Sequence, residues 1–178
     1  ALDSLPGGES ILLYGEPWMG GGTNLEGGAR PADKRALDAL HERIGFFCDD
    51  TRDCIKGNVF DAANAGYVNG APQHGYDVLH SISAWRSGAH GFWPKRAGQV
   101  VQYVSAHDNY TLWDKLAAVG RRGDYDCPDA DLLAQNRMTA GIYLTCQGLP
   151  FMQAGEEWGR TKYGDHNSYK GPLATNRL

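Results

Sequence analysis

The chain has 178 residues, of which 42% are hydrophobic and 21% are charged, and its formal net charge at pH 7 is −4. This composition is typical of a folded globular protein, and the acidic balance provides no electrostatic footprint for nucleic acid or for an anionic membrane surface. No apolar run approaches the roughly 20 residues that a transmembrane helix needs. We therefore expect no nucleic-acid partner and no membrane partner.

The first ten residues, ALDSLPGGES, have neither the basic start nor the apolar stretch of a signal peptide, and they do not begin with Met. The compartment therefore stays open between secreted and cytoplasmic. The chain also carries 24 glycines together with five Trp, nine Tyr and five Phe. Such a composition favours long ordered loops with stacking surfaces, which suit a carbohydrate or another flat-faced ligand.

The four cysteines, Cys48, Cys54, Cys127 and Cys146, form no C-x-x-C pair. Without a recognisable disulfide framework we interpret them as reduced, structural residues. The six histidines are irregularly spaced relative to the cysteines, so the pattern gives no basis for a zinc site.

The first predicted strand lies in ILLYGEPW, residues 11–18. Apolar residues bounded by glycine and proline are typical of a strand buried on both faces of a parallel sheet. Glu16 follows at the carboxyl end of that strand, where parallel α/β proteins bind their ligands. A solvated loop glutamate is the alternative interpretation of this stretch.

The same plan recurs three times, each time as an apolar run followed by polar or acidic residues. IGFFCDD ends in Asp49 and Asp50, GQVVQYVSAHDNY ends in the segment 107–110, and LPFMQAGEEWG ends in Glu156 and Glu157. We therefore expect strands near residues 10–15, 44–48, 99–105 and 149–154, as parallel neighbours in that order.

The connecting segments show helical patterns of different strength. Residues 32–43 predict a short helical or irregular piece, residues 50–75 a turn-rich excursion, and residues 76–85 a helix. Residues 111–120 predict a helix capped by Thr111, and residues 129–148 a longer helix that ends at Gly148. No linker interrupts these units, so we expect residues 1–178 to form one partial domain, equivalent to half of a closed (β/α)8 barrel.

Taken in order, YGEPW, FFCDDTRDCIKGNVFD, VQYVSAHDNYTLWDKL and YLTCQGLPFMQAGEEWGRTKYGDHNSY resemble the second half of the catalytic barrel of type I pullulanases, within the α-amylase family of glycoside hydrolases. The resemblance implies an α/β fold comprising strands 5 to 8 of a TIM barrel. It also implies retaining hydrolysis of α-1,6 branch linkages in pullulan, glycogen or related α-glucans, with two carboxylates at the cleavage point.

The resemblance also assigns roles to individual residues. Glu16 matches the general acid, and Asp108 matches the carboxylate that stabilises the transition state. Residues that match substrate contacts are His107, Trp18, Asn109, Tyr110, Asn167 and Tyr169. The chain departs from the commoner family pattern at His166, where an acidic residue is expected, so a sugar contact at that position is in doubt.

Two motifs of the family do not occur in this sequence. The nucleophile's motif, of the type GFRFDLM, is absent, and so is the motif of the type D-V-V-x-N-H. We therefore expect this chain to be a fragment of a larger enzyme, to pair with the remainder of the barrel, and to be inactive alone. The alternative is a non-catalytic module that keeps the glucan contacts as a binding surface or a subunit contact.

The remaining strand-end carboxylates, Asp49, Asp50, Glu156 and Glu157, either hold loops beside the cleft or contact substrate. Many relatives use calcium, and Asp49, Asp50 or Asp53 could contribute to such a site, but no loop of the D-x-D-x-D-G type is present. We therefore assign no metal site and no cofactor.

Overall fold

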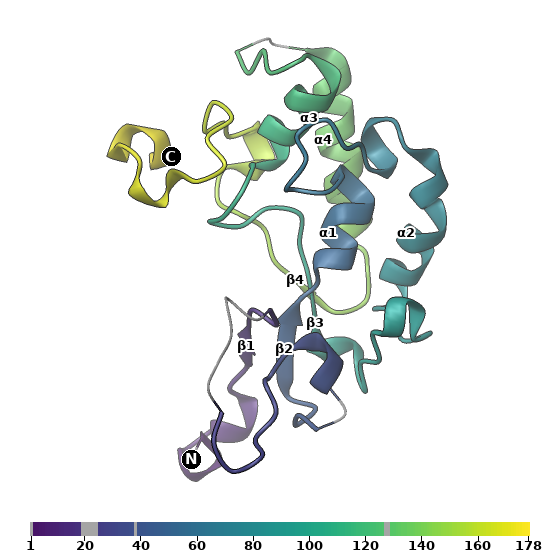
Figure 1. The fold of residues 1–178 in the computed structure, drawn as a ribbon, viewed down its shortest axis with the longest axis vertical. Coiled ribbons are helices and arrows are strands. Elements are labelled where there is room, and N and C mark those ends of the chain that lie inside the picture. The colour runs from purple at the N-terminus through teal and green to yellow at the C-terminus, as the bar shows by residue number, and fades with distance from the viewer. Residues whose placement is uncertain (1, 19–24, 38, 127–128) are drawn as a thin grey trace.

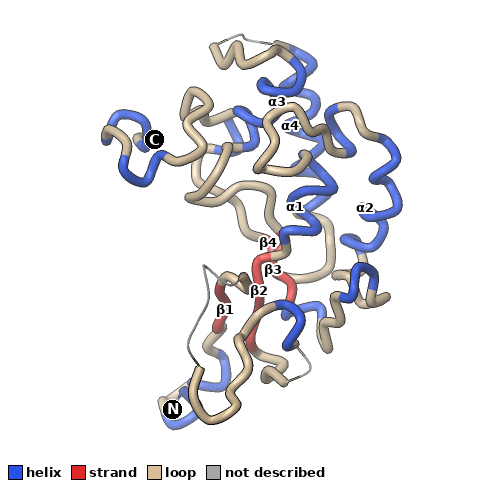
Figure 2. Tube along the Cα trace, viewed as in Figure 1, coloured by secondary structure: helices blue, strands red, loops and turns tan. Residues whose placement is uncertain are grey.

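A computed structural model of the chain describes residues 2–18, 25–37, 39–126 and 129–178. Its centre is a parallel sheet of four strands in the order β1-β2-β3-β4, shown in Figure 1 and, coloured by element type, in Figure 2. The strands are β1 (Leu13–Gly15), β2 (Ile44–Phe47), β3 (Val100–Gln102) and β4 (Leu149–Pro150). The predicted strand order and the parallel pairing are confirmed, although each strand is shorter than expected.

Four α-helices lie together at one side of this sheet, as Figure 1 shows. They are α1 (Asp49–Lys56), α2 (Gly75–Ile82), α3 (Leu112–Gly120) and α4 (Ala130–Tyr143). Helix α1 contacts α2, and α3 contacts α4. Short 3-10 turns complete the described chain, at Leu2–Ser4, Gly8–Ser10, Lys34–Ala36, Tyr67–Asn69, Pro72–His74, Ala89–Gly91, Ala97–Gln99, Glu156–Trp158, Ser168–Lys170 and Leu173–Asn176.

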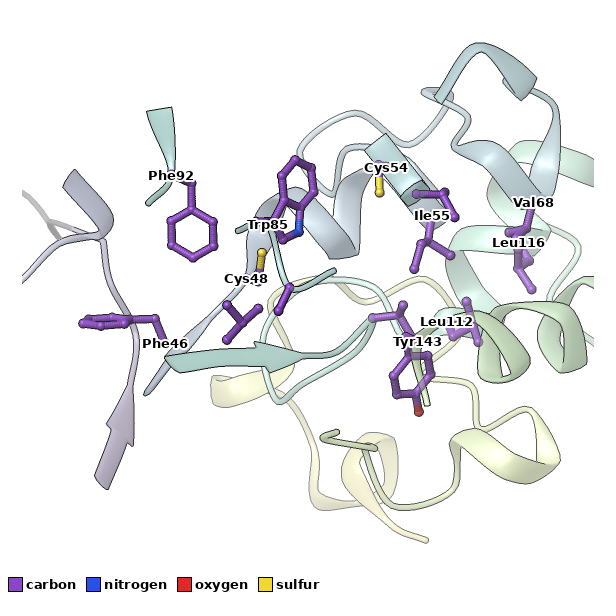
Figure 3. Packing of buried hydrophobic residues seen from close by; sticks show 14 of the residues in the cluster. Phe46, Cys48, Cys54, Ile55, Val68, Trp85, Phe92, Leu112, Leu116 and Tyr143 are labelled. Carbon is purple, nitrogen blue, oxygen red and sulfur yellow. The ribbon is translucent and has the colours of Figure 1, made fainter. Parts of the chain in front are cut away.

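The hydrophobic core lies between the sheet and the helices. Trp85, Ile55, Leu116 and Tyr143 are fully buried there, and Figure 3 shows how such side chains pack into one cluster. Burial of several large apolar side chains, each worth about 1.5 to 3 kcal/mol, is the main force that holds the helices onto the strands.

A buried polar network joins the helices to β3. The Thr51 hydroxyl on α1 donates to Gln102 Oε1 at 2.7 Å and accepts from Trp85 Nε1 at 2.8 Å. The Gln102 amide nitrogen in turn donates to the carbonyl oxygens of Ser81 and Gln147, at 2.9 and 2.8 Å. All the groups of this network have partners, so it fixes β3 and the segment that follows β3 relative to α1 and α2.

The helix boundaries follow local capping. The Thr111 hydroxyl accepts from the Asp114 amide at 3.1 Å, which is the cap that the sequence predicts for α3. Asp129 likewise accepts from the amides of Asp131 and Leu132 at the start of α4. Helix α4 ends at Tyr143 rather than at the predicted Gly148, and only a 3-10 turn over Lys34–Ala36 forms within residues 32–43.

Two further sequence expectations are wrong. Residues 49–56 form helix α1, not part of a turn-rich excursion, because Asp49 and Asp50 favour a helix start and Thr51, Cys54 and Ile55 bury one face. The second error concerns β1, which was expected to be buried on both faces. All three residues of β1 are exposed, because β1 is an edge strand and no described segment covers it.

The described thiols agree with the expectation of unpaired cysteines. Cys48, Cys54 and Cys146 are free and buried, while Cys127 lies outside the described residues. Among the described helices, none is long and apolar enough to cross a membrane.

Candidate active site

A cleft of about 660 Å³ opens at the carboxyl ends of the strands. Its walls come from the segment after β1, helix α1 and the loop that follows it, the segments after β3 and β4, and the loop that carries His166, Asn167 and Tyr169. Because parallel strands present all their carboxyl ends at one edge of the sheet, segments distant in sequence meet there.

Three polar side chains converge at the mouth of this cleft. His107 Nε2 lies 3.6 Å from Glu16 Oε1 and 3.4 Å from Asp108 Oδ2. One side-chain atom from each of the three residues lies within 4.8 Å of the others. All three residues are exposed, so a ligand can reach both carboxylates and the imidazole at once.

The other sequence-predicted site residues are distributed around this centre. Trp18, Asn109, Asn167 and Tyr169 also line the cleft. Tyr110 does not line it; its ring instead packs on the ring of His166, with centroids 5.5 Å apart. His166 itself belongs to the cleft wall, so the structure places an imidazole where the family pattern has an acid.

Sequence reasoning missed several residues of the cleft wall. Phe60 lines the cleft and is 83% exposed, which leaves its ring face free to stack on a ligand. Arg52 and Lys56 also line it, one helical turn apart on α1. Their spacing of four residues in one helix would have placed them on one face, had residues 49–56 been recognised as a helix.

Arg52 is held by three hydrogen bonds, two to Asp53 and one to Tyr103. Its guanidinium donates to Asp53 through Nε at 2.6 Å and to the Tyr103 hydroxyl through Nη1 at 2.9 Å. Burial raises the pKa of Tyr103 well above its ordinary value, so this phenol stays protonated. The cleft wall therefore contains a guanidinium that is ion-paired with Asp53 and a neutral phenol hydroxyl.

The remaining strand-end carboxylates have structural contacts. Asp49 and Asp50 both accept from Lys34 Nζ, at 2.7 and 2.8 Å, although Asp49 also touches the cleft. Glu156 is buried and accepts from the Tyr143 hydroxyl at 2.6 Å, and burial raises its pKa. Glu157 accepts from the backbone amide of Gly155 at 3.0 Å and is not part of the cleft wall.

The chain is similar to pullulanases in sequence and in fold. Its sequence is 36% identical to the pullulanase of Bacillus subtilis over 94% of the chain, and 23% of that relative is covered. The structure superposes on the pullulanase from Bacillus acidopullulyticus with a TM-score of 0.82 and 33% identity, over 95% of this chain and 20% of that one. The chain therefore matches one segment of the pullulanases.

Other relatives extend this family group. The pullulanase of Paenibacillus barengoltzii, solved in complex with maltohexaose and α-cyclodextrin, matches with a TM-score of 0.80 and 34% identity, over 94% of this chain and 25% of that one. Isoamylase 3 of rice is 28% identical over 88% of the chain, covering 21% of that relative. No family model matches the chain. The chain thus spans about a fifth to a quarter of the length of these four relatives.

Proposed function

We propose that this segment belongs to a glycoside hydrolase that cleaves α-1,6 branch linkages in α-glucans, and that it supplies the general acid and the transition-state carboxylate. The observation that carries the proposal is the convergence of Glu16, His107 and Asp108 within 4.8 Å at the carboxyl edge of a parallel sheet. The 36% identity to a pullulanase supports the same chemistry.

In this proposal Glu16 protonates the glycosidic oxygen as the bond breaks. Asp108 faces the same point and stabilises the positive charge that develops on the sugar ring, while His107 hydrogen-bonds that sugar. A retaining enzyme also needs a carboxylate nucleophile about 5 to 5.5 Å from the acid, on the other side of the scissile bond. We assign that nucleophile to the part of the parent enzyme outside this chain.

The aromatic residues of the cleft support a glucan as the ligand. Trp18, Phe60 and Tyr169 line the cleft and are exposed, so each offers an apolar ring face to a sugar. Asn109 and Asn167 add amide groups that can hydrogen-bond sugar hydroxyls. Solved pullulanases that match this chain hold maltose or maltohexaose, which favours the same class of ligand here.

We also propose that residues 1–178 form the second half, strands 5 to 8, of a (β/α)8 barrel. The support is the parallel order β1-β2-β3-β4 and the exposure of β1, whose Leu13 and Tyr14 are 48% and 46% exposed. An uncovered strand edge with apolar side chains favours pairing with a further strand. The remainder of the barrel would supply that strand.

The decisive experiment replaces Glu16 with Gln in the full-length protein that carries this segment. Loss of the proton donor should lower reducing-sugar release from pullulan by about 10²- to 10⁴-fold, while binding of maltotriose is retained. Glu157→Gln is the matched control, because this glutamate lies outside the cleft wall, and it should leave release unchanged.

The alternative, a glucan-binding or subunit-contact module, predicts a different pattern. In that case Glu16→Gln would leave hydrolysis unchanged while substitutions at Trp18 weaken glucan binding. Unchanged hydrolysis in the Glu16→Gln protein would therefore refute the acid role.

A further inference from the structure

Two buried lysines donate hydrogen bonds to the backbone at the two ends of the segment His107–Tyr110. Lys56 Nζ donates to the Tyr110 carbonyl oxygen at 2.9 Å, and Lys162 Nζ donates to the His107 carbonyl oxygen at 3.2 Å. The two lysines are 1% and 2% exposed. They bind the first and the last residue of the segment that carries His107 and Asp108 at the cleft.

These lysines come from two different parts of the fold. Lys56 ends helix α1, whereas Lys162 lies in the loop after β4. Lys162 also donates to the Ser168 hydroxyl at 3.1 Å, so it joins the His107–Tyr110 segment to the wall that carries Asn167 and Tyr169. A third contact, from Gln153 Nε2 to the Ala106 carbonyl at 2.6 Å, anchors the residue just before the segment.

Burying two lysine amino groups is costly unless they are hydrogen-bonded, so their positions call for a specific role. Burial, together with repulsion from the charges of Arg52 and Lys115, lowers the pKa of Lys56 to about 7, against the attraction of Glu156 and Asp53. Burial also lowers the pKa of Lys162. The acceptors in the segment are neutral carbonyl oxygens, which fix backbone position but neutralise no charge.

The backbone of the segment explains why such anchoring is useful. Asn109 adopts a left-handed conformation with φ of 61°, which turns the chain sharply between the two gripped carbonyls. Residues held in such conformations depend on their surroundings to stay there. A shift of the segment would move Asp108 and His107 together away from Glu16.

We propose that Lys56 and Lys162 are positioning residues, which clamp the two ends of His107–Tyr110 so that Asp108 and His107 face the general acid. The effect on catalysis rests on the proposed function. The clamp itself, meaning the hydrogen bonds from the two lysines to the ends of His107–Tyr110, rests on the structure alone.

Hydrogen–deuterium exchange in the full-length protein tests the clamp without reference to activity. Lys56→Met and Lys162→Met should each speed exchange of the peptide spanning residues 105–111. Lys115→Met is the matched control, because Lys115 is equally buried and donates to the carbonyls of Asn58 and Asp61, outside the segment. Exchange of residues 105–111 that is unchanged in both test variants, or raised equally in the control, would overturn the proposal.

Kinetics on pullulan then test the catalytic consequence. Because a displacement of about 1 Å can cost about 100-fold in rate, Lys56→Met should lower kcat by about 10- to 100-fold with little change in KM. Lys162→Met should lower kcat and raise KM, since it also releases the wall at Ser168. Lys115→Met should raise KM, because Lys115 holds the loop that carries Phe60, but it should keep kcat within about twofold of wild type.

The possible outcomes separate the two proposals. A wild-type protein that releases no sugar from pullulan would refute the proposed function, and the exchange experiment would still decide the clamp. Where Lys56→Met fails to fold, as judged by tryptophan fluorescence, Lys56→Gln takes its place with the same expected loss of kcat. An active wild type with unchanged kcat in both lysine variants would refute the positioning role.

Discussion

Replacing Thr51 with Val tests the buried network under the cleft. Valine has nearly the shape of threonine, so the substitution removes the hydroxyl without opening a cavity. Trp85 Nε1 then loses its hydrogen-bond acceptor, the Thr51 hydroxyl at 2.8 Å. Gln102 Oε1 loses its donor, the same hydroxyl at 2.7 Å. All three side chains are fully buried, so water cannot replace the hydroxyl.

The magnitude follows from these two orphaned groups. Each buried polar group left unsatisfied costs about 1 to 3 kcal/mol, so the free energy of unfolding should fall by about 2 to 6 kcal/mol. With a urea m-value of about 2 kcal/mol per molar, the unfolding midpoint should fall by about 1 to 3 M. Tryptophan fluorescence is a suitable readout because Trp85 is itself buried in the network.

Two further variants make this measurement specific. Thr139→Val removes an equally buried hydroxyl that donates only to the Gln135 carbonyl in its own helix, at 2.8 Å, and should cost about 0.5 kcal/mol or less. Thr51→Ser keeps the hydroxyl and should cost about 1 kcal/mol for the lost methyl group. A Thr51→Val midpoint within about 0.3 M of wild type would refute the reasoning.

Two other predictions concern titratable groups. Burial raises the pKa of Cys48 to about 12 and that of Cys146 to about 11. A Cys127→Ser protein should therefore show no fast thiol reaction with a disulfide reagent near about pH 8 until urea is added, and fast labelling would contradict the burial. Partial burial opposes ionisation of Asp77, yet hydrogen bonds from His90 and His74 hold its pKa below its ordinary value. Its contribution to stability is therefore present above about pH 4 and is lost as the pH falls through the lower folded pKa. The deficit in the unfolding midpoint of Asp77→Asn should therefore be present above about pH 4 and should shrink as the pH falls below it, and a deficit independent of pH would speak against these contacts of Asp77.

The sheet was predictable from the sequence because its signal is local and repeated. Each strand is a short apolar run that ends in polar residues, and the four runs recur in the order in which the strands pair. The helix at 49–56 was missed because its apolar face contains only Cys54 and Ile55. The other residues include three acids and two basic residues, so the sequence shows no clear helical periodicity. The exposure of β1 was missed because burial of an edge depends on what else pairs with it, which no local pattern encodes.

The candidate site was predictable in part for the same reason. Glu16, His107 and Asp108 stand at strand ends, so the sheet alone brings them to one edge. Phe60 and Lys56 could not be placed, because their positions depend on how α1 and its following loop pack against β3. Tyr110 was itself predicted to contact substrate, yet its ring packs on that of His166, since the left-handed Asn109 redirects the chain just before it.

That left-handed residue gives a final prediction. Asparagine tolerates φ of 61° better than any residue with a branched Cβ, so Asn109→Val should lower the free energy of unfolding by about 1 to 2 kcal/mol. For Asn109→Gly the free energy of unfolding should stay within about 0.5 kcal/mol of wild type. Glycine adopts a positive φ without strain, and this gain offsets the larger backbone entropy that glycine has in the unfolded chain. Both variants lose the amide that we propose contacts sugar, so both should bind maltotriose more weakly. Urea midpoints thus measure the backbone role and calorimetry measures the side-chain role. Equal losses of stability in the two variants would show that the amide, and not the turn, accounts for asparagine at this position.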